Sequence, residues 1–373
     1  MRIGIPKEIK NHEYRVGMIP ASVREAVAHG HEVFVQAGAA ERQGIQDSDY
    51  IKAGAKILSA ADEVFANAEL IVKVKEPQTD ECARLRGGQT LFTYLHLAAD
   101  AEQTQALIKS GVTAIAYETV TRAGGGLPLL SPMSEVAGRM AIQAGAHCLE
   151  MEQGGRGMLL GGTAGVAPAK VVVLGGGVSG VNAVRMAIGL EAFVTVIDIN
   201  IERLYALDQQ FGASVNTIFS TRQAIEDYVL DADLVIGAVL VPGAAAPKLI
   251  TADLVAAMKR GSVIVDISID QGGCSETSKP TTHAKPTYVT HGVVHYCVTN
   301  MPGAVARTST FALNNATLPF ILALADKGPI AAMAADPHLL AGLNVHAGKI
   351  THPAVAQALG LAHTDAGKAI GAR

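Results

Sequence analysis

The chain lacks several features that mark whole classes of protein. It contains no tryptophan, and aromatic residues make up only 4% of its 373 residues. Charged residues account for 17%, against about 25% in an average soluble protein. The 34 acidic and 30 basic side chains leave a net charge of −4, and no run of Lys or Arg occurs. Because nucleic-acid-binding proteins present a concentrated positive surface, we expect no nucleic-acid partner.

Two further absences concern location. The four cysteines are scattered without a Cys-x-x-Cys pair, which is typical of reduced thiols rather than of a disulfide framework or a zinc site. Charges interrupt the N-terminus at once, and no uncharged apolar stretch approaches the roughly 20 residues of a membrane span. These absences predict a cytoplasmic protein with no membrane partner and no bound metal.

Apolar residues are plentiful. Hydrophobic residues reach 49%, which excludes a disordered chain. Because charges are so few, we expect some apolar surface to be buried between the subunits of a homo-oligomer. At roughly 150 residues per domain, the length predicts about two domains.

Short strand-like runs alternate with helical patterns through the first 300 residues, which predicts parallel sheets built from right-handed βαβ units. The first series of predicted strands is 2–5, 32–36, 70–74, 90–94 and 113–117, with helices at 21–29 and 101–109. A Gly/Pro-rich stretch at 123–132 and a helix at about 133–152 form a connector. The second series of predicted strands is 171–174, 193–197, 234–238, 262–267 and 293–298.

The C-terminal tail, residues 307–373, has the pattern of helices and loops. Its clearest helix is 310–324, and it has no evident strand. A segment of this kind is too small to form a domain alone, so we expect it to pack on the N-terminal domain. The sequence thus predicts two doubly wound α/β domains. One is a discontinuous substrate domain (1–130 and 307–373), and the other is a Rossmann NAD-binding domain (131–306) that includes the connecting helix.

The sharpest local signal follows the strand at 171–174. Gly175, Gly177 and Gly180 match the pattern G-x-G-x-x-G, ahead of a helix predicted at 182–190. In this pattern the first glycine permits a tight turn, the second lets the backbone reach a pyrophosphate, and the third allows close packing of helix on strand. Backbone amides of the loop and helix start, Val178 and Ser179 among them, would then bind the anion. A glycine-rich turn without a ligand is the alternative.

Asp198 stands at the end of the next predicted strand, 18 residues after Gly180. A carboxylate at this place can accept hydrogen bonds from both ribose hydroxyls and would repel a 2′-phosphate. The residue therefore favours NAD over NADP. A solvated carboxylate at a strand end is the alternative.

Polar residues also follow other predicted strands, where open α/β sheets bind their ligands. They are Arg15, Lys75, His96 and Glu118 in the first series, and Asp270 and Asn300 in the second. If these two sets of strand ends face each other, they form a cleft between the domains.

The chemistry of this set suits a small keto or amino acid. Arg15 and Lys75 are able to hold a carboxylate, and His96 can exchange protons near neutral pH. Asp270 can orient ammonia or a carbinolamine. By position alone, a Lys or Glu after a strand is usually a solvated charge, and a lone His is more often structural than catalytic. Asp266, inside its strand, is expected to be structural.

Eight segments resemble the alanine dehydrogenase family, whose members are NAD-linked and interconvert L-alanine with pyruvate and ammonium. In order along about 300 residues, they are 4–8 (GIPKE), 13–16 (EYRV), 72–77 (VKVKEP), 95–98 (LHLA), 131–138 (SPMSEVAG), 237–243 (GAVLVPG), 266–273 (DISIDQGG) and 300–302 (NMP).

The resemblance implies a role for individual residues. It implies that His96 and Asp270 are the catalytic pair and that Arg15 and Lys75 bind the substrate carboxylate. The NAD contacts that it implies are Ser134, Asp198, Arg203, Ser220, Val239, Leu240, Ile267, Ser268, Ile269, Asp270, Val298, Asn300 and Met301. It also implies a homohexamer and an N-terminal domain completed by the C-terminal tail.

Three alternatives remain at this point. The first is the NAD(H)-binding component of a proton-translocating transhydrogenase, a relative with the same two-domain plan. The second is a non-enzymatic NAD-sensing regulator. The third is a dehydrogenase acting on a larger amino acid, such as saccharopine. The joint presence of His96, Lys75, Arg15 and Asp270 argues against the first two, whereas the volume of the substrate pocket would decide the third.

Overall fold

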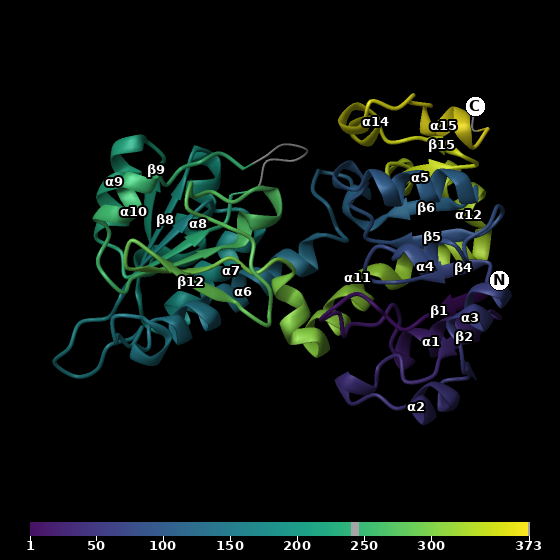
Figure 1. The fold of residues 1–373 in the computed structure, drawn as a ribbon, viewed down its shortest axis with the longest axis horizontal. Coiled ribbons are helices and arrows are strands. Elements are labelled where there is room, and N and C mark those ends of the chain that lie inside the picture. The colour runs from purple at the N-terminus through teal and green to yellow at the C-terminus, as the bar shows by residue number, and fades with distance from the viewer. Residues whose placement is uncertain (240–245, 372–373) are drawn as a thin grey trace. The chain divides into compact units, whose positions relative to one another are not determined.

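The computed structural model describes residues 1–239 and 246–371. They form two compact units, each a twisted sheet flanked by helices (Figure 1). The first unit comprises Met1–Met133 and Val305–Arg373, and the second comprises Ser134–Ala304. The chain thus leaves the first unit, builds the second and returns.

The sheet of the first unit has the strand order β15-β14-β6-β5-β4-β1-β2-β3 among the described residues. Strands β1 to β6 run parallel, and β14 and β15 are antiparallel additions at one edge. The strand bounds are β1 (Arg2–Ile5), β2 (Glu32–Gln36), β3 (Lys56–Leu58), β4 (Leu70–Val72), β5 (Thr90–Thr93), β6 (Thr113–Ala116), β14 (Leu343–His346) and β15 (Lys349–Ile350).

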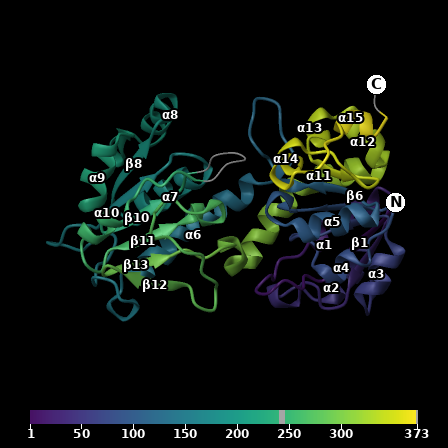
Figure 2. The ribbon, with the colours of Figure 1, turned by 45° about the horizontal axis from the view of Figure 1, so that its top comes forward.

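The prediction that the tail has no strand is wrong, because β14 and β15 both belong to it. β14 pairs with β6, more than 200 residues away in sequence, and the register shifts between Leu343 and Val345. A run of four residues has too short a pattern to be recognised without its partner. The tail does pack on the first unit, as expected, and Figure 2 shows its helices gathered beside β6.

The helices of the first unit include those predicted at 21–29 and 101–109. Their observed bounds, with the others, are α1 (Pro20–Ala28), α2 (Asp47–Lys52), α3 (Ala61–Asn67), α4 (Thr79–Cys82), α5 (Ala101–Ser110), α11 (Ala306–Lys327), α12 (Pro329–Ala335), α13 (Pro337–Leu340), α14 (Pro353–Leu359) and α15 (Ala366–Ala369).

The sheet of the second unit has the order β12-β13-β11-β10-β7-β8-β9 and is parallel except for β12. Its strand bounds are β7 (Lys170–Leu174), β8 (Phe193–Asp198), β9 (Asn216–Phe219), β10 (Leu234–Gly237), β11 (Val263–Asp266), β12 (Thr287–Thr290) and β13 (Val293–Tyr296). Its helix bounds are α6 (Ser131–Cys148), α7 (Val178–Gly189), α8 (Ile201–Phe211), α9 (Arg222–Leu230) and α10 (Ala252–Ala257).

Strand β7 shows why the central strands were predictable. Val171 and Val173 pack into the apolar cluster on one face of the sheet, whereas Val172 and Leu174 pack into the cluster on the other. A strand covered on both faces must be apolar throughout, so it stands out in the sequence. The unpredicted strands β3, β9 and β12 lie at sheet edges and are partly exposed, so they lack this signal.

The connecting helix was predicted at about 133–152 but spans Ser131–Cys148 as α6. After α6 ends at Cys148, the chain turns back over the C-terminal end of this helix. Gly155 donates from its backbone N to Glu150 O at 3.0 Å, and Gly157 donates to Leu149 O at 2.8 Å. A Cβ at Gly155 would lie 2.2 Å from Cys148 O, so this close return needs glycine.

Among the described residues, no single helix is long and apolar enough to cross a membrane. By length and composition alone, one pair bent by 116°, Met301–Lys327 with Pro329–Ala335, meets the test.

Candidate active site

The loop after β7 has the backbone geometry that a dinucleotide pyrophosphate needs. Gly175 has a φ of +94°, a conformation that favours glycine. A Cβ at Gly180 would lie 1.8 Å from Gly175 O, so helix and strand approach too closely for any side chain. A Cβ at Gly177 would meet no atom within 4 Å, which leaves this part of the loop open to a ligand.

Helix α7 begins directly at this loop, at Val178, with Gly177 as N-cap and no side-chain cap. The helix start predicted from the sequence, Asn182, lies four residues later, because that prediction assigns all the glycines to the loop. The amides of the first helical turn, those of Val178 and Ser179 included, have no acceptor within the helix and carry the positive end of its dipole. They fit a bound phosphate.

Asp198 ends β8 beside the same loop. Its Oδ2 accepts a hydrogen bond from Gly176 N at 2.6 Å, and its Oδ1 accepts one from Asn200 N at 2.8 Å. Arg203 donates from Nε to Gly176 O. Because a carboxylate has about four acceptor positions, Asp198 retains capacity for ribose hydroxyls. The residues present therefore fit a dinucleotide with an unphosphorylated ribose.

Most other cofactor candidates follow the carboxyl ends of parallel strands in this unit, so they share one edge of the sheet. Ser220 comes directly after β9, and its N donates to Asp198 O at 3.0 Å. Val239 follows β10, and its carbonyl accepts from Ser268 Oγ at 2.7 Å. Leu240 lies outside the described residues. The remaining candidates follow β11 or β13, and of these Ile269, Val298 and Met301 are buried, whereas Asn300 has a φ of +62°.

Ser134 belongs to α6 rather than to a strand end, yet α6 reaches the nucleotide loop. A Cβ at Gly138 would lie 2.0 Å from Ser179 O, so the two helices touch at the first turn of α7. Ser134 and Gly138 are four residues apart and share a helix face. The structure thus places the Ser134 side of α6 toward this turn.

Asp266 has a structural role, as expected, and it bears on Asp270. It is fully buried at the end of β11. Its Oδ1 accepts from Ser268 N at 3.0 Å, and its Oδ2 accepts from Cys274 N at 2.9 Å and from Ser278 Oγ at 2.5 Å. These bonds hold the short 3₁₀ helix Ile267–Gln271, on which Asp270 is exposed.

In the first unit, Arg15, Lys75, His96 and Glu118 follow β1, β4, β5 and β6, which are neighbours in the sheet. The structure therefore brings the four to one edge. The Arg15 loop runs close against the end of β4, since a Cβ at Gly17 would lie 2.3 Å from Val72 O.

Arg15 is a buried cation, only 2% exposed, held by a carboxylate that sequence reasoning missed. Its Nε donates to Glu13 Oε1 at 2.7 Å and its Nη2 to Glu13 Oε2 at 2.6 Å. Its Nη1 lies 3.0 Å from Met133 Sδ. Burial alone would lower the pKa of Arg15, but the charge of Glu13 outweighs it and raises the pKa. The guanidinium is thus charged and fixed in direction.

Lys75 follows β4 with its side chain 14% exposed and its Nζ 3.9 Å from Glu76 Oε2. Glu76 also pairs with Lys10. Burial would raise the pKa of Glu76, yet Lys75 and Lys10 lower it. The loop after β1 and the loop after β4 are therefore linked by paired charges.

A second link, centred on Lys73, is wholly buried. Lys73 Nζ donates to Glu8 Oε2 at 3.0 Å and to Glu81 Oε1 at 2.7 Å. Glu8 Oε1 also accepts from Val74 N at 2.7 Å. Burial is the main reason that the pKa of Glu8 rises to about 7, despite the opposing charge of Lys73. This network joins the loop that leads to Arg15 with the strand end that carries Lys75.

His96 has an unusual backbone and an accessible ring. Its φ of 52° and ψ of 36° are left-handed, a region that non-glycine residues rarely occupy. The side chain is 47% exposed and stacks on Tyr94, with ring centroids 5.9 Å apart. Tyr94 is fixed in turn, because its hydroxyl donates to Leu129 O at 2.5 Å. The imidazole thus has a defined place at the sheet edge and can reach a ligand.

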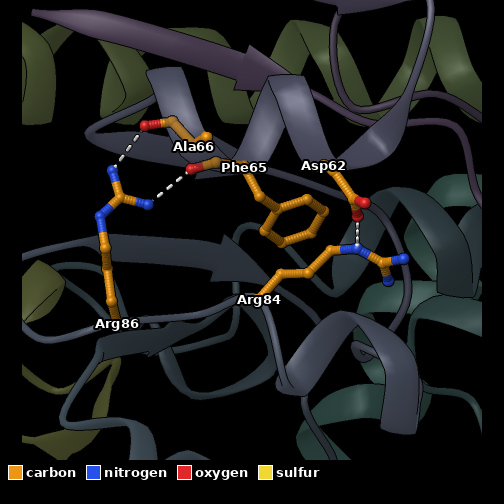
Figure 3. Close-up of a pocket in the computed structure, with 5 residues that line it drawn as sticks. All are labelled: Asp62, Phe65, Ala66, Arg84 and Arg86. Atoms are coloured by element: carbon orange, nitrogen blue, oxygen red, sulfur yellow. Dashed lines mark hydrogen bonds and ion pairs between the residues drawn. The ribbon is translucent and has the colours of Figure 1, made fainter.

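A cavity of about 370 Å³ lies at the opposite edge of this sheet (Figure 3). Arg86 donates from Nη1 to Phe65 O at 2.6 Å and from Nη2 to Ala66 O at 3.0 Å, at the end of α3, and Arg84 pairs with Asp62. Because these segments lead into the amino ends of β4 and β5, the cavity is remote from the edge that carries His96. Arg86 thus stabilises the end of α3, and Arg84 contacts its first turn.

Sequence reasoning missed Glu8, Glu13, Lys73 and Glu81. One of the four did leave a signal: Lys73 lies inside the apolar run predicted as a strand at 70–74, and a lysine buried there needs a carboxylate partner. Nothing local identified which carboxylates these would be, since Glu8 is 65 residues away.

The chain is similar to known proteins over its whole length. The family described as Alanine dehydrogenase/PNT, N-terminal domain, matches residues 4–137, and Alanine dehydrogenase/PNT, C-terminal domain, matches residues 141–353. An alanine dehydrogenase from Halomonas elongata is 62% identical over 371 residues, covering 100% of both chains.

Two solved structures extend this comparison. An L-alanine dehydrogenase superposes with a TM-score of 0.94 at 53% identity, covering 96% of this chain and 99% of that chain. A transhydrogenase from Sinorhizobium meliloti gives a TM-score of 0.81 at 26% identity, covering 94% of this chain and 100% of the other. The predicted two-domain α/β fold class, with a Rossmann-like nucleotide-binding domain, is confirmed.

Proposed function

The chain belongs to the alanine dehydrogenase/PNT family, and from this membership we propose that it catalyses the NAD-dependent, reversible oxidative deamination of L-alanine to pyruvate and ammonium. The structural observation that carries the proposal is the edge of the first unit's sheet, where Arg15, Lys75 and His96 follow neighbouring strands. Two cations and an exposed imidazole are what a small 2-keto or 2-amino acid requires.

The residues of the first unit would act on the substrate. Arg15 and Lys75 hold its carboxylate, and the pairing of Arg15 with Glu13 keeps the guanidinium in one direction. When ammonia has added to C2 of pyruvate, His96 protonates the departing oxygen of the carbinolamine as water leaves. In the opposite direction His96 removes a proton from the attacking water. Asp270, exposed on its 3₁₀ helix in the second unit, is the second proposed catalytic group and takes up protons from the nitrogen.

The second unit would bind the cofactor, whose nicotinamide supplies or accepts the hydride. The amides after Gly177 hold the pyrophosphate, and Asp198 holds the ribose and excludes a 2′-phosphate. The further contacts are those named from the sequence, from Ser134 to Met301. This arrangement supports NAD rather than NADP.

We also propose a cytoplasmic homo-oligomer, specifically a homohexamer. Exposed apolar side chains in one segment support association: Met151 is 73% exposed, Leu159 71% and Val166 60%. The cysteines Cys82, Cys148, Cys274 and Cys297 are all free, in keeping with a reducing compartment.

The test is NADH oxidation, followed at 340 nm, by the purified protein with pyruvate and ammonium, omitting each component in turn. Glyoxylate, 2-oxobutyrate, 2-oxoglutarate and NADPH run in parallel. Oxidation that requires both pyruvate and ammonium supports the proposal. Binding of NADH without reduction of any keto acid would favour a sensor or a transhydrogenase-like component, and a preference for 2-oxoglutarate with lysine would favour the saccharopine-type reaction.

A further inference from the structure

The backbone at His96 needs support from outside its own strand. The residue is in the left-handed region, which a residue with a Cβ occupies only where its surroundings hold it there. The 3₁₀ helix Leu97–Ala99 starts directly after it, and Ala99 N donates to His96 O at 3.1 Å. The bend at His96 therefore turns the chain from β5 into this helix and sets the direction of the imidazole.

Glu118 supplies the support. Its Oε1 accepts from His96 N at 2.6 Å and from Leu95 N at 3.1 Å, and its Oε2 accepts from Leu95 N at 3.2 Å. A single carboxylate thus satisfies two consecutive amides at the bend. Such charge-assisted bonds are among the stronger ones in proteins.

Glu118 is itself fixed by the C-terminal tail. It lies in the 3₁₀ helix Tyr117–Thr119 after β6, and Asn344 of β14 donates from Nδ2 to Thr119 Oγ1 at 2.8 Å. Helix α14 packs against the 3₁₀ helix that begins after His96. The tail therefore braces both ends of the contact between Glu118 and the His96 backbone.

We infer that Glu118 is a positioning residue for the reaction, whose carboxylate holds the left-handed bend that presents the His96 imidazole. This inference rests on the proposed function, in particular on the proton role of His96. The alternative is a proton or charge role for Glu118 itself. The geometry speaks against that role, since Glu118 Oε1 is 4.0 Å from His96 Nδ1, beyond hydrogen-bond distance.

Two conservative variants separate the two roles. Glu118→Gln loses the charge but keeps an oxygen at the place of Oε1, which makes both the His96 and the Leu95 contacts. Glu118→Asp keeps the charge but withdraws the carboxylate by one methylene, out of reach of His96 N. If the role is positioning, kcat falls by less than about fivefold in the Gln variant, the cost of weakening one hydrogen bond. It falls by about 100-fold in the Asp variant, as expected when a reacting group moves by about 1 Å.

Matched controls come from Glu63, a carboxylate that also binds two consecutive amides, those of Ser59 and Ala60, but at the start of α3. Glu63→Gln and Glu63→Asp should leave kcat within about twofold, since distant sites act independently. The KM for pyruvate and the dissociation constant for NADH should stay near wild type in both Glu118 variants, because Glu118 is not among the residues proposed to hold either ligand.

The outcomes separate this inference from the proposed function. If the wild-type protein does not oxidise NADH with pyruvate and ammonium, the proposed function fails and this inference fails with it. If the His96→Ala variant keeps its turnover, the proposed proton role of His96 fails, and this inference fails with it. If the wild type is active and depends on His96, equal losses in the Gln and Asp variants, or no loss in either, overturn positioning alone. A larger loss in Gln than in Asp overturns positioning and assigns a charge role. A larger loss of kcat in Glu118→Asp than in Glu118→Gln, with KM near wild type, confirms that Glu118 is a positioning residue.

Discussion

The sheet edges proposed to bind ligands differ between the two units in the kind of group that they present. In the second unit the groups that fit the cofactor are mainly backbone atoms, those of Gly175, Gly177 and the first turn of α7, with Asp198 as the charged exception. In the first unit the groups proposed to act on the substrate are side chains, and each contacts a carboxylate through its side chain or its backbone. Arg15 has Glu13 and His96 has Glu118.

This difference determines how each unit responds to substitution. A backbone site fails when an added Cβ moves the chain, so its sensitive positions are glycines. A site of paired buried charges fails when one partner is removed, because the other is left uncompensated at a cost of about 3–5 kcal/mol. The predictions below test that contrast.

The largest effect is expected from Gly180→Ala. Its Cβ would lie 1.8 Å from Gly175 O, so α7 must separate from β7 and the glycine loop must shift. We predict a loss of about 1–3 kcal/mol or more in the free energy of unfolding, as overpacking costs. We further predict an NADH affinity weaker by about 100-fold, measured by fluorescence titration.

Gly189→Ala is the matched control for that prediction. It lies in the same helix, and its Cβ would meet no atom within 4 Å. Alanine there should leave NADH binding unchanged and stabilise the helix by up to about 1 kcal/mol. Equal effects of the two substitutions would show that the close approach at Gly180 does not matter.

The buried charges of the first unit predict a pH effect on stability. Burial raises the pKa of Glu8 to about 7, from an ordinary value of 4.5, in the presence of Lys73, Glu81 and Glu13. The folded protein therefore binds this proton more tightly than the unfolded chain. The contribution of Glu8 protonation to the free energy of unfolding is complete below about pH 4.5 and is lost as the pH rises to about 7. Its upper limit is about 3 kcal/mol.

Glu8→Gln checks this effect, because glutamine cannot titrate. Between pH 5 and pH 8 the Tm of the wild type should fall more steeply than that of the variant, by differential scanning calorimetry. Parallel curves would mean that Glu8 titrates as an ordinary carboxylate. Glu63→Gln, on the exposed start of α3, is the control in the same unit.

A smaller effect is expected at Asp198, a charged side chain among the proposed cofactor contacts of the second unit. Asp198→Asn keeps one acceptor oxygen for Gly176 N and removes the repulsion of a 2′-phosphate. The ratio of kcat/KM for NADH over NADPH should fall by about tenfold, the equivalent of one weakened charged hydrogen bond. An unchanged ratio would remove Asp198 from cofactor discrimination.

The same contrast explains what the sequence could predict. The nucleotide loop was recognisable because backbone geometry demands glycine at fixed spacing, next to a strand that is apolar on both faces. Polar candidates of the first unit were located from the strand ends, but their roles came from the family resemblance. Glu8 was missed because its importance depends on pairing with Lys73, 65 residues away. Glu13 and Glu81 lie near their partners Arg15 and Lys73 in sequence, but no local pattern shows that these pairs are buried.

The tail shows a second kind of limit. β14 has four residues and pairs with β6 only after the chain has built an entire second unit. No local pattern of that length distinguishes a strand from a loop. The contact by which β14 supports the segment that carries Glu118 could not be predicted either, because Asn344 and Thr119 are 225 residues apart in sequence.

The most direct test of the account is His96→Ala, measured for NADH binding and for turnover in one preparation. The central claim is that the His96 imidazole of the first unit transfers protons, whereas groups of the second unit hold the cofactor. It predicts that kcat for pyruvate and ammonium falls by about 10²–10⁴, the usual contribution of a general acid–base group. The dissociation constant for NADH should stay within about twofold of wild type, because His96 is not among the residues proposed to hold the cofactor. Turnover near wild type, or a parallel loss of NADH binding, would contradict it.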